Sequence, residues 1–200
     1  MSKSVYNLEH QNSHLPSKIT VALEKISEAY RIMLWDEAKK YKLSPIQIQL
    51  IVFIQSHREE YNTVSYLSKE FNITKATISD SVKTLESKGI VQKITNHNDS
   101  RSFSLELTKV GVELQSKLLH YSSNMLDPIT FLNQTEQQKL WAVLSALIEN
   151  LNSTGIVNMQ RMCYSCSYFN SKDGVNHCNL LEKVLTPIDI RIDCPEHKTA

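Results

Sequence analysis

All four cysteines of this 200-residue sequence lie within the last 40 residues. This clustering makes cysteine the residue type most suited to support chemistry. They are spaced as Cys163-x2-Cys166-x11-Cys178-x15-Cys194. A Cys-x2-Cys turn lets two thiolates face one metal ion, and two further thiolates complete a tetrahedron. The first 14 residues are polar and lack the apolar core of a signal peptide, so we expect a cytoplasmic protein. In that reducing compartment, clustered cysteines favour a metal or redox site over disulfides.

The spacing predicts a four-cysteine centre but leaves the bound metal open. Zn²⁺ is the first prediction, because a segment of this size buries little apolar surface and a metal would supply the missing stability. An iron–sulfur cluster is the alternative, favoured by the long and unequal spacing after the first pair and by the Cys194-Pro195 step. Bare redox thiols or buried cysteines are a third interpretation. His177 and His197 lie close to the cysteines in sequence and are interpreted as neighbours of the site, not as ligands.

No catalytic motif accompanies the cysteines. The sequence lacks a glycine-rich phosphate loop, a Gly-x-Ser-x-Gly motif and a His-Glu-x-x-His motif. A four-cysteine zinc site also leaves no open position for a substrate, so we expect a protein that is not an enzyme. The formal net charge is +1, so any nucleic-acid binding would need a local basic patch. No stretch approaches the ~18 consecutive apolar residues of a membrane span, and no membrane partner is expected.

The elements that must position these groups are predicted to be mainly helical, since only four glycines and five prolines interrupt the chain. Apolar residues recur at spacings of three and four between residues 16 and 41, which is typical of one face of a long helix. Ser44 suits the N-cap and Pro45 the first turn of a second helix. That helix is apolar nearly all round and is therefore expected in the core. A short helix at 63–71 and a further helix at 74–88 follow.

The apolar period changes to two after residue 89. Residues 90–94 and 102–107 are predicted to form two strands joined by a polar hairpin. Two long helices are predicted next, one over 110–125 and one that begins with a capping box formed by Thr135 and Gln138. The second helix carries leucines at a 4-3-4 spacing, which suits either a dimer interface or an intrachain core: Leu140, Leu144, Leu147 and Leu151.

Helix, short helix, turn, helix and a two-stranded ribbon follow one another in the order of a winged helix–turn–helix. The functional interpretation is that helix 74–88 enters a DNA major groove, which is wide enough for one helix. Its predicted buried side is formed by Ile78, Val82 and Leu85. The alternative is an ordinary amphipathic helix with a solvated face. The opposite side is small or hydrogen-bonding, as base contacts require: Lys75, Ala76, Thr77, Asp80, Lys83, Thr84 and Ser87.

The stretch 73–111 resembles the MarR family of bacterial transcription regulators in an ordered series of short motifs. The resemblance extends over residues 17–153 in the order and length of the helices. It implies an obligate homodimer with interleaved first and last helices, and a wing in which Asp99 orients Arg101 toward a minor groove. Helix 74–88 would then contact DNA through Thr74, Lys75, Thr77, Ser79, Asp80 and Lys83. The matching residues are Thr74, Thr77, Ile78 and Ser79; Leu85, Lys88, Gly89, Ile90 and Val91; Asp99 and Arg101; and Leu107, Thr108 and Gly111.

Asp80 departs from the family pattern, because many members carry arginine at this place. An aspartate cannot bind phosphate or the acceptor atoms of guanine, but it can accept a hydrogen bond from cytosine N4. The operator sequences of relatives are therefore not expected to transfer to this chain. The basic residues of the predicted interface are also partly offset by acidic neighbours, so we expect modest non-specific affinity with a strong dependence on salt.

The predicted fold class is mainly α. It combines a winged helix–turn–helix, long dimerisation helices and a small β-wing with a small metal-stapled C-terminal extension. The predicted divisions are a flexible N-terminal segment at 1–16, a regulator domain at 17–155 and a cysteine-rich extension at 156–200, called the cysteine tail below.

The predicted function is sequence-specific DNA binding by a homodimer that acts as a transcription regulator, with repression as the expected effect. Loss, oxidation or exchange of the metal would shift the spacing of the two recognition helices and weaken operator binding. The alternative is a repressor that responds to a small molecule bound near Tyr30, Met33, Trp35 and Phe53, with a purely structural metal. A protein-binding scaffold is disfavoured, because the exposed side of helix 74–88 carries no large apolar residue.

Overall fold

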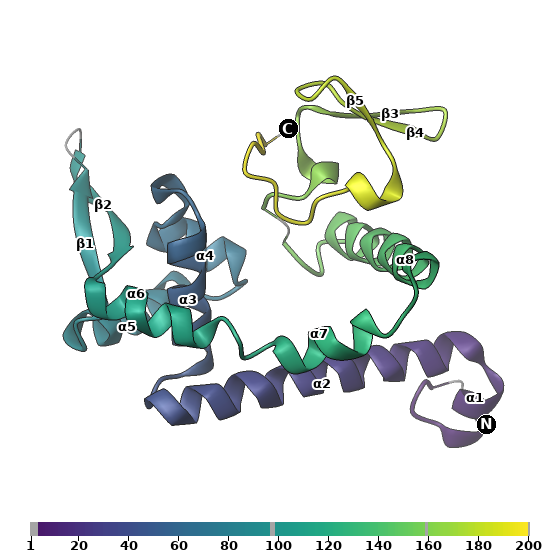
Figure 1. Cartoon of the computed structure of the whole chain (residues 1–200), viewed down its shortest axis with the longest axis horizontal. Coiled ribbons are helices and arrows are strands. Elements are labelled where there is room, and N and C mark those ends of the chain that lie inside the picture. Colours follow the sequence, from purple (N-terminus) through teal and green to yellow (C-terminus); the bar gives the residue numbers. More distant parts are fainter. Residues whose placement is uncertain (1–3, 97–98, 159, 200) are drawn as a thin grey trace.

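The computed structural model describes residues 4–96, 99–158 and 160–199, and at residues 96 and 99–102 it describes the backbone alone. Figure 1 shows a long N-terminal helix, a winged lobe at one end of this helix, and the cysteine tail beside the last long helix. The winged lobe comprises residues 43–121. No helix in these described ranges is both long enough and apolar enough to cross a membrane.

Helix α2 (Leu15–Tyr41) confirms the long helix expected from residue 16. A short helix, α1 (Leu8–Ser13), precedes it within the segment expected to be flexible. Helix α2 ends at Lys42, whose φ of 52° is left-handed and whose backbone N–H donates to the carbonyl oxygens of Ala38 and Lys39. This cap turns the chain away from the α2 axis and into the winged lobe.

The helix–turn–helix begins with α3 (Pro45–Ser56), where the predicted cap is confirmed. The Gln47 N–H donates to Ser44 Oγ and the Ser44 N–H donates to Gln47 Oε1, which is a capping box. A short 3-10 turn, η1 (Glu59–Tyr61), leads to α4 (Val64–Glu70), and α5 (Lys75–Ser87) follows after a tight turn. The lobe core is apolar and includes Ala38 of α2, which is 0% exposed. The lobe residues of this core that are less than 2% exposed are Ile48, Leu50, Ile51, Leu67, Ile78, Val82, Leu85, Val91, Leu105 and Leu118.

The wing is an antiparallel ribbon of β1 (Val91–Asn96) and β2 (Asp99–Leu107). Both strands extend closer to the hairpin tip than predicted, because β1 ends at residue 96 instead of 94 and β2 begins at residue 99 instead of 102. Gly89 ends the connection from α5 with a φ of 66°, a left-handed conformation that glycine adopts without strain. Gly89 thus ends α5 in the manner of a C-terminal glycine cap.

Gly111 and Thr108 fix the base of the wing. A Cβ atom on Gly111 would lie 2.1 Å from the carbonyl oxygen of Ile90, so only glycine allows helix α6 (Lys109–Leu118) to approach the start of β1 this closely. Thr108 Oγ1 accepts a hydrogen bond from the Gly111 N–H and donates one to the Gly89 carbonyl. The Leu-Thr-x-x-Gly motif is thus explained by packing and capping.

The prediction of a single helix over residues 110–125 is wrong. The helix breaks between α6 and α7 (Ser123–Thr130), where the Tyr121 and Ser123 N–H groups bond over three residues to Leu118 and His120. Ser122, Ser123 and Asn124 follow one another here. Side chains of these types compete with the backbone for hydrogen bonds and lower helix propensity, which accounts for the break.

The predicted start of the last long helix is also wrong, by two residues. Helix α8 (Gln134–Ser153) is capped by Asn133, whose Oδ1 accepts the Glu136 N–H at 3.1 Å while Glu136 Oε2 accepts the Asn133 N–H at 2.9 Å. Thr135 therefore lies inside the first turn. A carboxylate in the first turn interacts favourably with the positive end of the helix, which favours this capping box over Thr135 and Gln138.

The cysteine tail folds as a small three-stranded antiparallel sheet in the order β3 (Phe169–Lys172), β4 (Val175–Cys178) and β5 (Lys183–Leu185), with 3-10 turns η2 (Cys163–Ser165) and η3 (Pro187–Asp189). Its buried apolar residues are Met162, Leu185 and Ile190, and Ile148 of α8 packs against them. The Trp141 indole N–H of α8 also donates to the Pro187 carbonyl at 2.8 Å. The tail is thus packed against the last long helix.

Candidate nucleic-acid interface and cysteine pocket

Helix α5 presents the polar face that the sequence predicts. Ile78, Val82 and Leu85 are at most 1% exposed and pack into the winged lobe. Thr74, Lys75, Thr77, Asp80 and Lys83 are exposed on the other side, and Ser79 is half-buried at its edge. The predicted DNA-contacting side chains of this helix therefore share one accessible surface.

Some side chains on this surface already form hydrogen bonds within α5 or at its N-cap. Thr74 is the N-cap of α5, and its Oγ1 accepts the Thr77 N–H at 3.2 Å and lies 2.9 Å from Thr77 Oγ1. Lys83 Nζ donates to Asp80 Oδ1 at 3.0 Å, one turn away on the helix. Both side chains of this pair are at least 70% exposed, so the pair is weak and can exchange for contacts with a ligand.

The wing is attached to the helix–turn–helix at its base. Ser104 Oγ donates to Glu59 Oε1 at 2.6 Å, and the Leu105 N–H donates to the Asn62 carbonyl at 2.8 Å. Asp99 and Arg101 belong to β2, and their side chains lie outside the described part of the chain. The predicted orientation of Arg101 by Asp99 stays a prediction.

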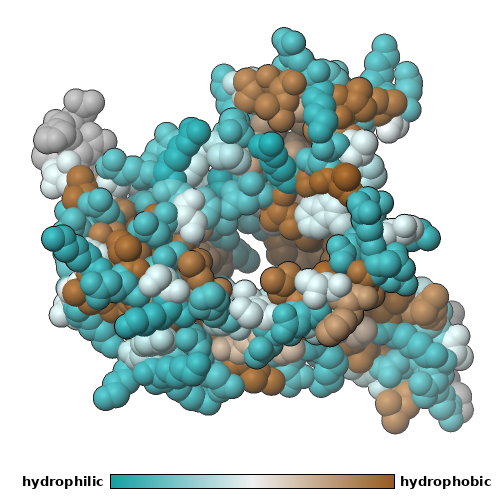
Figure 2. Space-filling view, viewed as in Figure 1, coloured by the Kyte–Doolittle hydropathy of each residue, from teal (hydrophilic) through white to brown (hydrophobic). Residues whose placement is uncertain are grey.

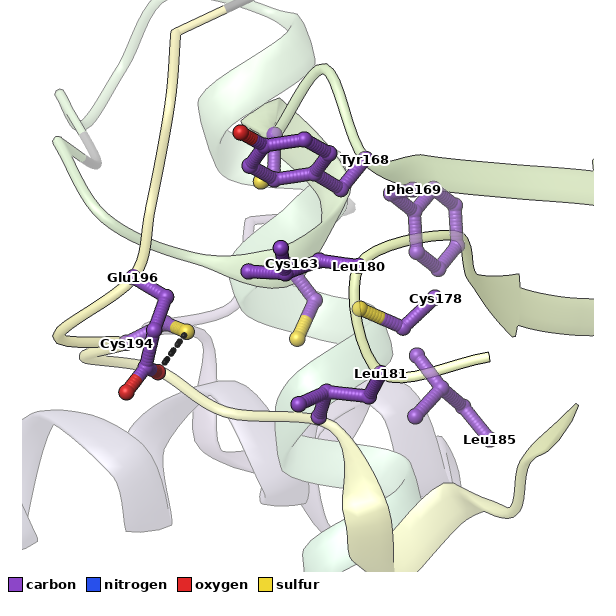
Figure 3. A pocket seen from close by; sticks show the side chains of 10 residues that line it. Cys163, Tyr168, Phe169, Cys178, Leu180, Leu181, Leu185, Cys194 and Glu196 are labelled. Atoms are coloured by element: carbon purple, nitrogen blue, oxygen red, sulfur yellow. Dashed lines mark hydrogen bonds between the residues drawn. The ribbon is translucent and has the colours of Figure 1, made fainter. Parts of the chain in front are cut away.

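The four cysteines of the tail line one pocket (Figure 3). Cys163 and Cys166 flank η2, Cys178 ends β4, and Cys194 follows η3. Figure 3 shows the sulfur atoms of Cys163, Cys178 and Cys194 directed into the pocket. The rest of the wall is apolar apart from one carboxylate and one phenol: Tyr168, Phe169, Leu180, Leu181, Leu185 and Glu196.

The cysteines are free thiols, and among the described residues no three His, Cys, Asp or Glu side chains are placed to hold one metal ion. The predicted metal therefore stays a prediction. Burial raises the pKa of the Cys163 thiol, although the Arg191 N–H, which donates to Cys163 Sγ at 3.2 Å, opposes this. The Arg191 guanidinium lies 3.6 Å from Cys194 Sγ and 3.0 Å from Glu196 Oε2. Arginine thus borders two of the four thiols.

A second cluster joins the cysteine tail to the helix–turn–helix. Its centre is Arg161, which is only 4% exposed and lies two residues before Cys163. Its Nε donates to Asp193 Oδ1 at 2.6 Å, and its Nη1 and Nη2 donate to the two carboxylate oxygens of Glu70 at 3.1 and 3.2 Å. Its Nη1 also donates to the Tyr66 hydroxyl. Two acidic groups, one from the tail and one from α4, therefore share a single guanidinium.

Aromatic rings and a histidine complete this Arg161 cluster. The guanidinium carbon lies 5.0 Å from the centre of the Phe53 ring and 5.3 Å from that of Tyr61. His57 Nε2 lies 2.7 Å from Asp193 Oδ2 and its Nδ1 donates to the Phe53 carbonyl. Burial would lower the pKa of Arg161, but hydrogen bonds to Asp193 and Glu70 outweigh it and raise this pKa. The guanidinium therefore stays charged throughout the physiological pH range.

Part of the Arg161 cluster could be predicted from the sequence. Arg161 and Asp193 stand beside Cys163 and Cys194, so their position next to candidate ligands was a usable signal. Tyr66, Glu70 and His57 belong to no recognised motif, and their partners lie 91 to 136 residues away. Phe53, expected near a small-molecule site, faces this cluster, whereas Tyr30 and Trp35 lie on an exposed face of α2.

Two helices outside the lobe keep large apolar side chains exposed. Figure 2 shows apolar patches among the polar side chains and an opening between the winged lobe and α8. An exposed apolar helix face marks a surface for protein association. The exposed residues are Ile19, Leu23, Ile26, Tyr30, Ile32 and Trp35 on α2, and Leu140, Val143, Leu147 and Leu151 on α8.

Most of the winged lobe is similar in sequence to known transcription regulators. Residues 41–102 match the MarR family. The HTH-type transcriptional regulator BilQ of Clostridioides difficile is 34% identical over 76 residues, which are 38% of this chain and 50% of BilQ. The HTH-type transcriptional regulator SarZ of Staphylococcus haemolyticus is 26% identical over 112 residues, 56% of this chain and 74% of SarZ. The chain thus spans half the length of BilQ and about three quarters of SarZ.

Solved structures share the fold. S. aureus MepR, in its DNA complex, has a TM-score of 0.58 at 18% identity, over 66% of this chain and 97% of MepR. Streptococcus pneumoniae FabT, in complex with DNA, has a TM-score of 0.59 at 22% identity, over 68% of this chain and 97% of FabT. At these identities the similarity establishes the winged-helix fold alone.

Proposed function

We propose that this chain, whose residues 41–102 carry a MarR-family winged helix–turn–helix, is a dimeric DNA-binding transcription regulator and not an enzyme. The observation that carries the proposal is the division of α5 into a fully buried apolar side and an exposed polar side. That division places one polar helix face outward on a rigid lobe, as insertion into a major groove requires. We therefore expect the protein to act on DNA in the cytoplasm.

The roles within α5 follow from side-chain chemistry. Lys75 and Lys83 neutralise phosphates, and Lys83 exchanges its exposed partner Asp80 for the DNA backbone. Thr77 and Ser79 supply hydroxyls that accept and donate hydrogen bonds. Asp80, released from Lys83, accepts a hydrogen bond from cytosine N4. In the wing, Arg101 reaches the minor groove with Asp99 as its support.

The exposed apolar faces of α2 and α8 support a homodimer. Their large side chains are spaced along two long helices, which suits the interleaved first and last helices that the family resemblance implies. A dimer reads two half-sites when its recognition helices lie about one duplex turn, ~34–36 Å, apart. We expect sedimentation to give a dimer at every concentration at which the chain is folded, and a stable folded monomer would contradict the proposal.

DNA binding is tested by selecting duplexes from a randomised library with the full chain and measuring their affinity across salt concentrations. Lys75→Ala should weaken binding to every duplex and reduce the salt slope by about 1. Asp80→Ala should change the selected sequence more than the affinity. Lys172→Ala on β3 of the tail is the control, because it removes the same charge from an exposed site distant from α5 in the sequence. A library that shows no enrichment would refute the proposed function.

The cysteine tail is proposed to hold a metal centre that modulates operator binding, and repression is the expected effect. Its four thiols line one pocket, and Cys163 lies two residues after Arg161, which donates to Glu70 of α4. The competing candidate is a small-molecule-responsive repressor whose metal is structural only. Equal operator affinity of the metal-loaded and metal-free dimers would favour that candidate.

A further inference from the structure

The four tail cysteines line one pocket but are not placed to share a single metal ion among the residues that the structure describes. A single zinc ion binds sulfur at ~2.3 Å, which brings its four sulfur ligands to about 3.8 Å from one another. The thiols of Cys163, Cys178 and Cys194 are directed into this pocket, which Cys166 also lines (Figure 3).

An iron–sulfur cluster fits such an arrangement, because iron and sulfide atoms lie between its cysteine ligands and hold them apart. Phe169, Leu180, Leu181 and Leu185 give the pocket a largely apolar wall. The Arg191 N–H donates to Cys163 Sγ and the Arg191 side chain approaches Cys194 Sγ. Hydrogen bonds and a cation at the ligand sulfurs stabilise the negative charge of a thiolate-bound cluster.

The backbone connects this pocket directly to the Arg161 cluster. The Cys194 N–H donates to the Arg161 carbonyl at 3.0 Å, and the Cys163 N–H donates to the Arg191 carbonyl at 3.0 Å. Asp193, which binds Arg161, immediately precedes Cys194. A displacement of Cys163 or Cys194 is therefore transmitted through the backbone to Arg161 and Asp193.

On the other side, Arg161 reaches the helix that supports α5. Glu70 ends α4 and Tyr66 lies one turn before it, and α4 packs on α5 across a tight turn. The same tail packs on α8 through Pro187 and Ile190. The tail thus spans the opening between the winged lobe and α8 that Figure 2 shows.

We propose that the four tail cysteines hold an iron–sulfur cluster, and that cluster occupancy sets the position of α4 and α5 relative to α8 through the Arg161 cluster. The loaded tail holds the recognition helix in its DNA-binding orientation, and the empty tail lets it move. The regulatory half of this proposal rests on the proposed DNA-binding function. The cofactor half does not.

The cofactor is tested on the full chain purified without oxygen, by measuring iron, acid-labile sulfide and zinc and by recording a visible absorption spectrum. We expect a brown protein with iron and sulfide in equal amounts, lost together in Cys178→Ser. One zinc per chain in a colourless protein, or a folded tail free of both metals, would overturn the assignment.

The coupling is tested first without DNA. Removal of the metal with a chelator under anaerobic conditions should lower hydrogen-exchange protection of α4 amides in the wild-type chain. Glu70→Gln should show low α4 protection in both states while keeping its iron content. Glu113→Gln is the matched control, because Glu113 is exposed on α6 and belongs neither to α4 nor to the Arg161 cluster. Unchanged α4 protection after metal removal from the wild type would refute the coupling.

The functional consequence is then measured on a duplex selected by the wild-type protein. The loaded dimer should bind it at least ~10-fold more tightly than the metal-free dimer, and this ratio should fall close to 1 in Glu70→Gln. A loaded protein that selects no duplex would refute the DNA-binding proposal, whereas the iron content and the α4 protection would still decide the cluster and its coupling.

Discussion

The winged lobe and the cysteine tail are stabilised by different kinds of interaction. Sixteen described residues form the buried apolar cluster centred on the lobe, whereas three, Met162, Leu185 and Ile190, form that of the tail. Apolar burial of the first kind stabilises a domain by itself, and segments of about 40 residues usually need a metal, a disulfide or a partner. The tail adds to its small core a pocket lined by four cysteines, an ion-pair cluster and a neighbouring helix. The lobe is therefore stable on its own core. The tail is conditional, because its folding depends on groups outside its small core.

The largest expected effect comes from truncating the lobe core. Leu50→Ala removes a side chain with 0% exposure and should lower the free energy of unfolding by ~2–5 kcal/mol, measured by denaturant titration at fixed protein concentration. The matched truncation in the tail, Leu185→Ala, should leave this transition unchanged and should make the tail sensitive to protease. Equal loss of lobe stability in both variants would mean that the two regions fold as one unit.

A smaller effect is expected at the base of the wing. Gly111→Ala forces a Cβ against the Ile90 carbonyl oxygen, and the resulting shift of backbone should cost ~1–3 kcal/mol of unfolding free energy. Ser116→Ala, at an exposed position of the same helix, is the control and should change stability by less than ~0.5 kcal/mol. A Gly111→Ala protein as stable as the control would show that the wing base can relax freely.

The smallest effect on the lobe is expected from losing a cysteine. Cys178→Ser should leave the lobe transition within ~0.5 kcal/mol of wild type, because the lobe has its own core. Limited proteolysis should nevertheless cut the variant within residues 160–197, since closing the loops between the ligands has an entropy cost that only the cofactor offsets. An intact tail in this variant would contradict the view that the tail is conditional.

The predictability of the two regions differs for the same reason. In the lobe, Ser44, Thr74 and Gly89 follow local rules of capping, and the apolar period of α5 identifies its buried side. These features depend on residues within one turn of each other, so a sequence displays them. The break after α6 and the cap at Asn133 were missed because several adjacent polar residues could each have served.

The cysteine tail was predictable only in its residue types. The spacing of the thiols indicated a shared site, and the structure brings all four to one pocket. The contacts of Arg161 with Glu70 and Tyr66 join residues 91 and 95 positions apart and follow no periodic pattern. Such pairings depend on the whole fold, so no local rule reveals them.

The separation between Glu70 and Arg161 also has a consequence in time. A ribosome adds roughly 5–20 residues per second, so Arg161 is made roughly 5–18 s after Glu70, from which it is 91 positions distant. Helix formation and collapse of a small domain are far faster than this. The helix–turn–helix of each new chain therefore folds with Glu70 and Tyr66 facing water, and it meets its guanidinium partner only later. Every newly synthesised molecule therefore passes through a state in which the helix–turn–helix is folded but not yet bound to the cysteine tail.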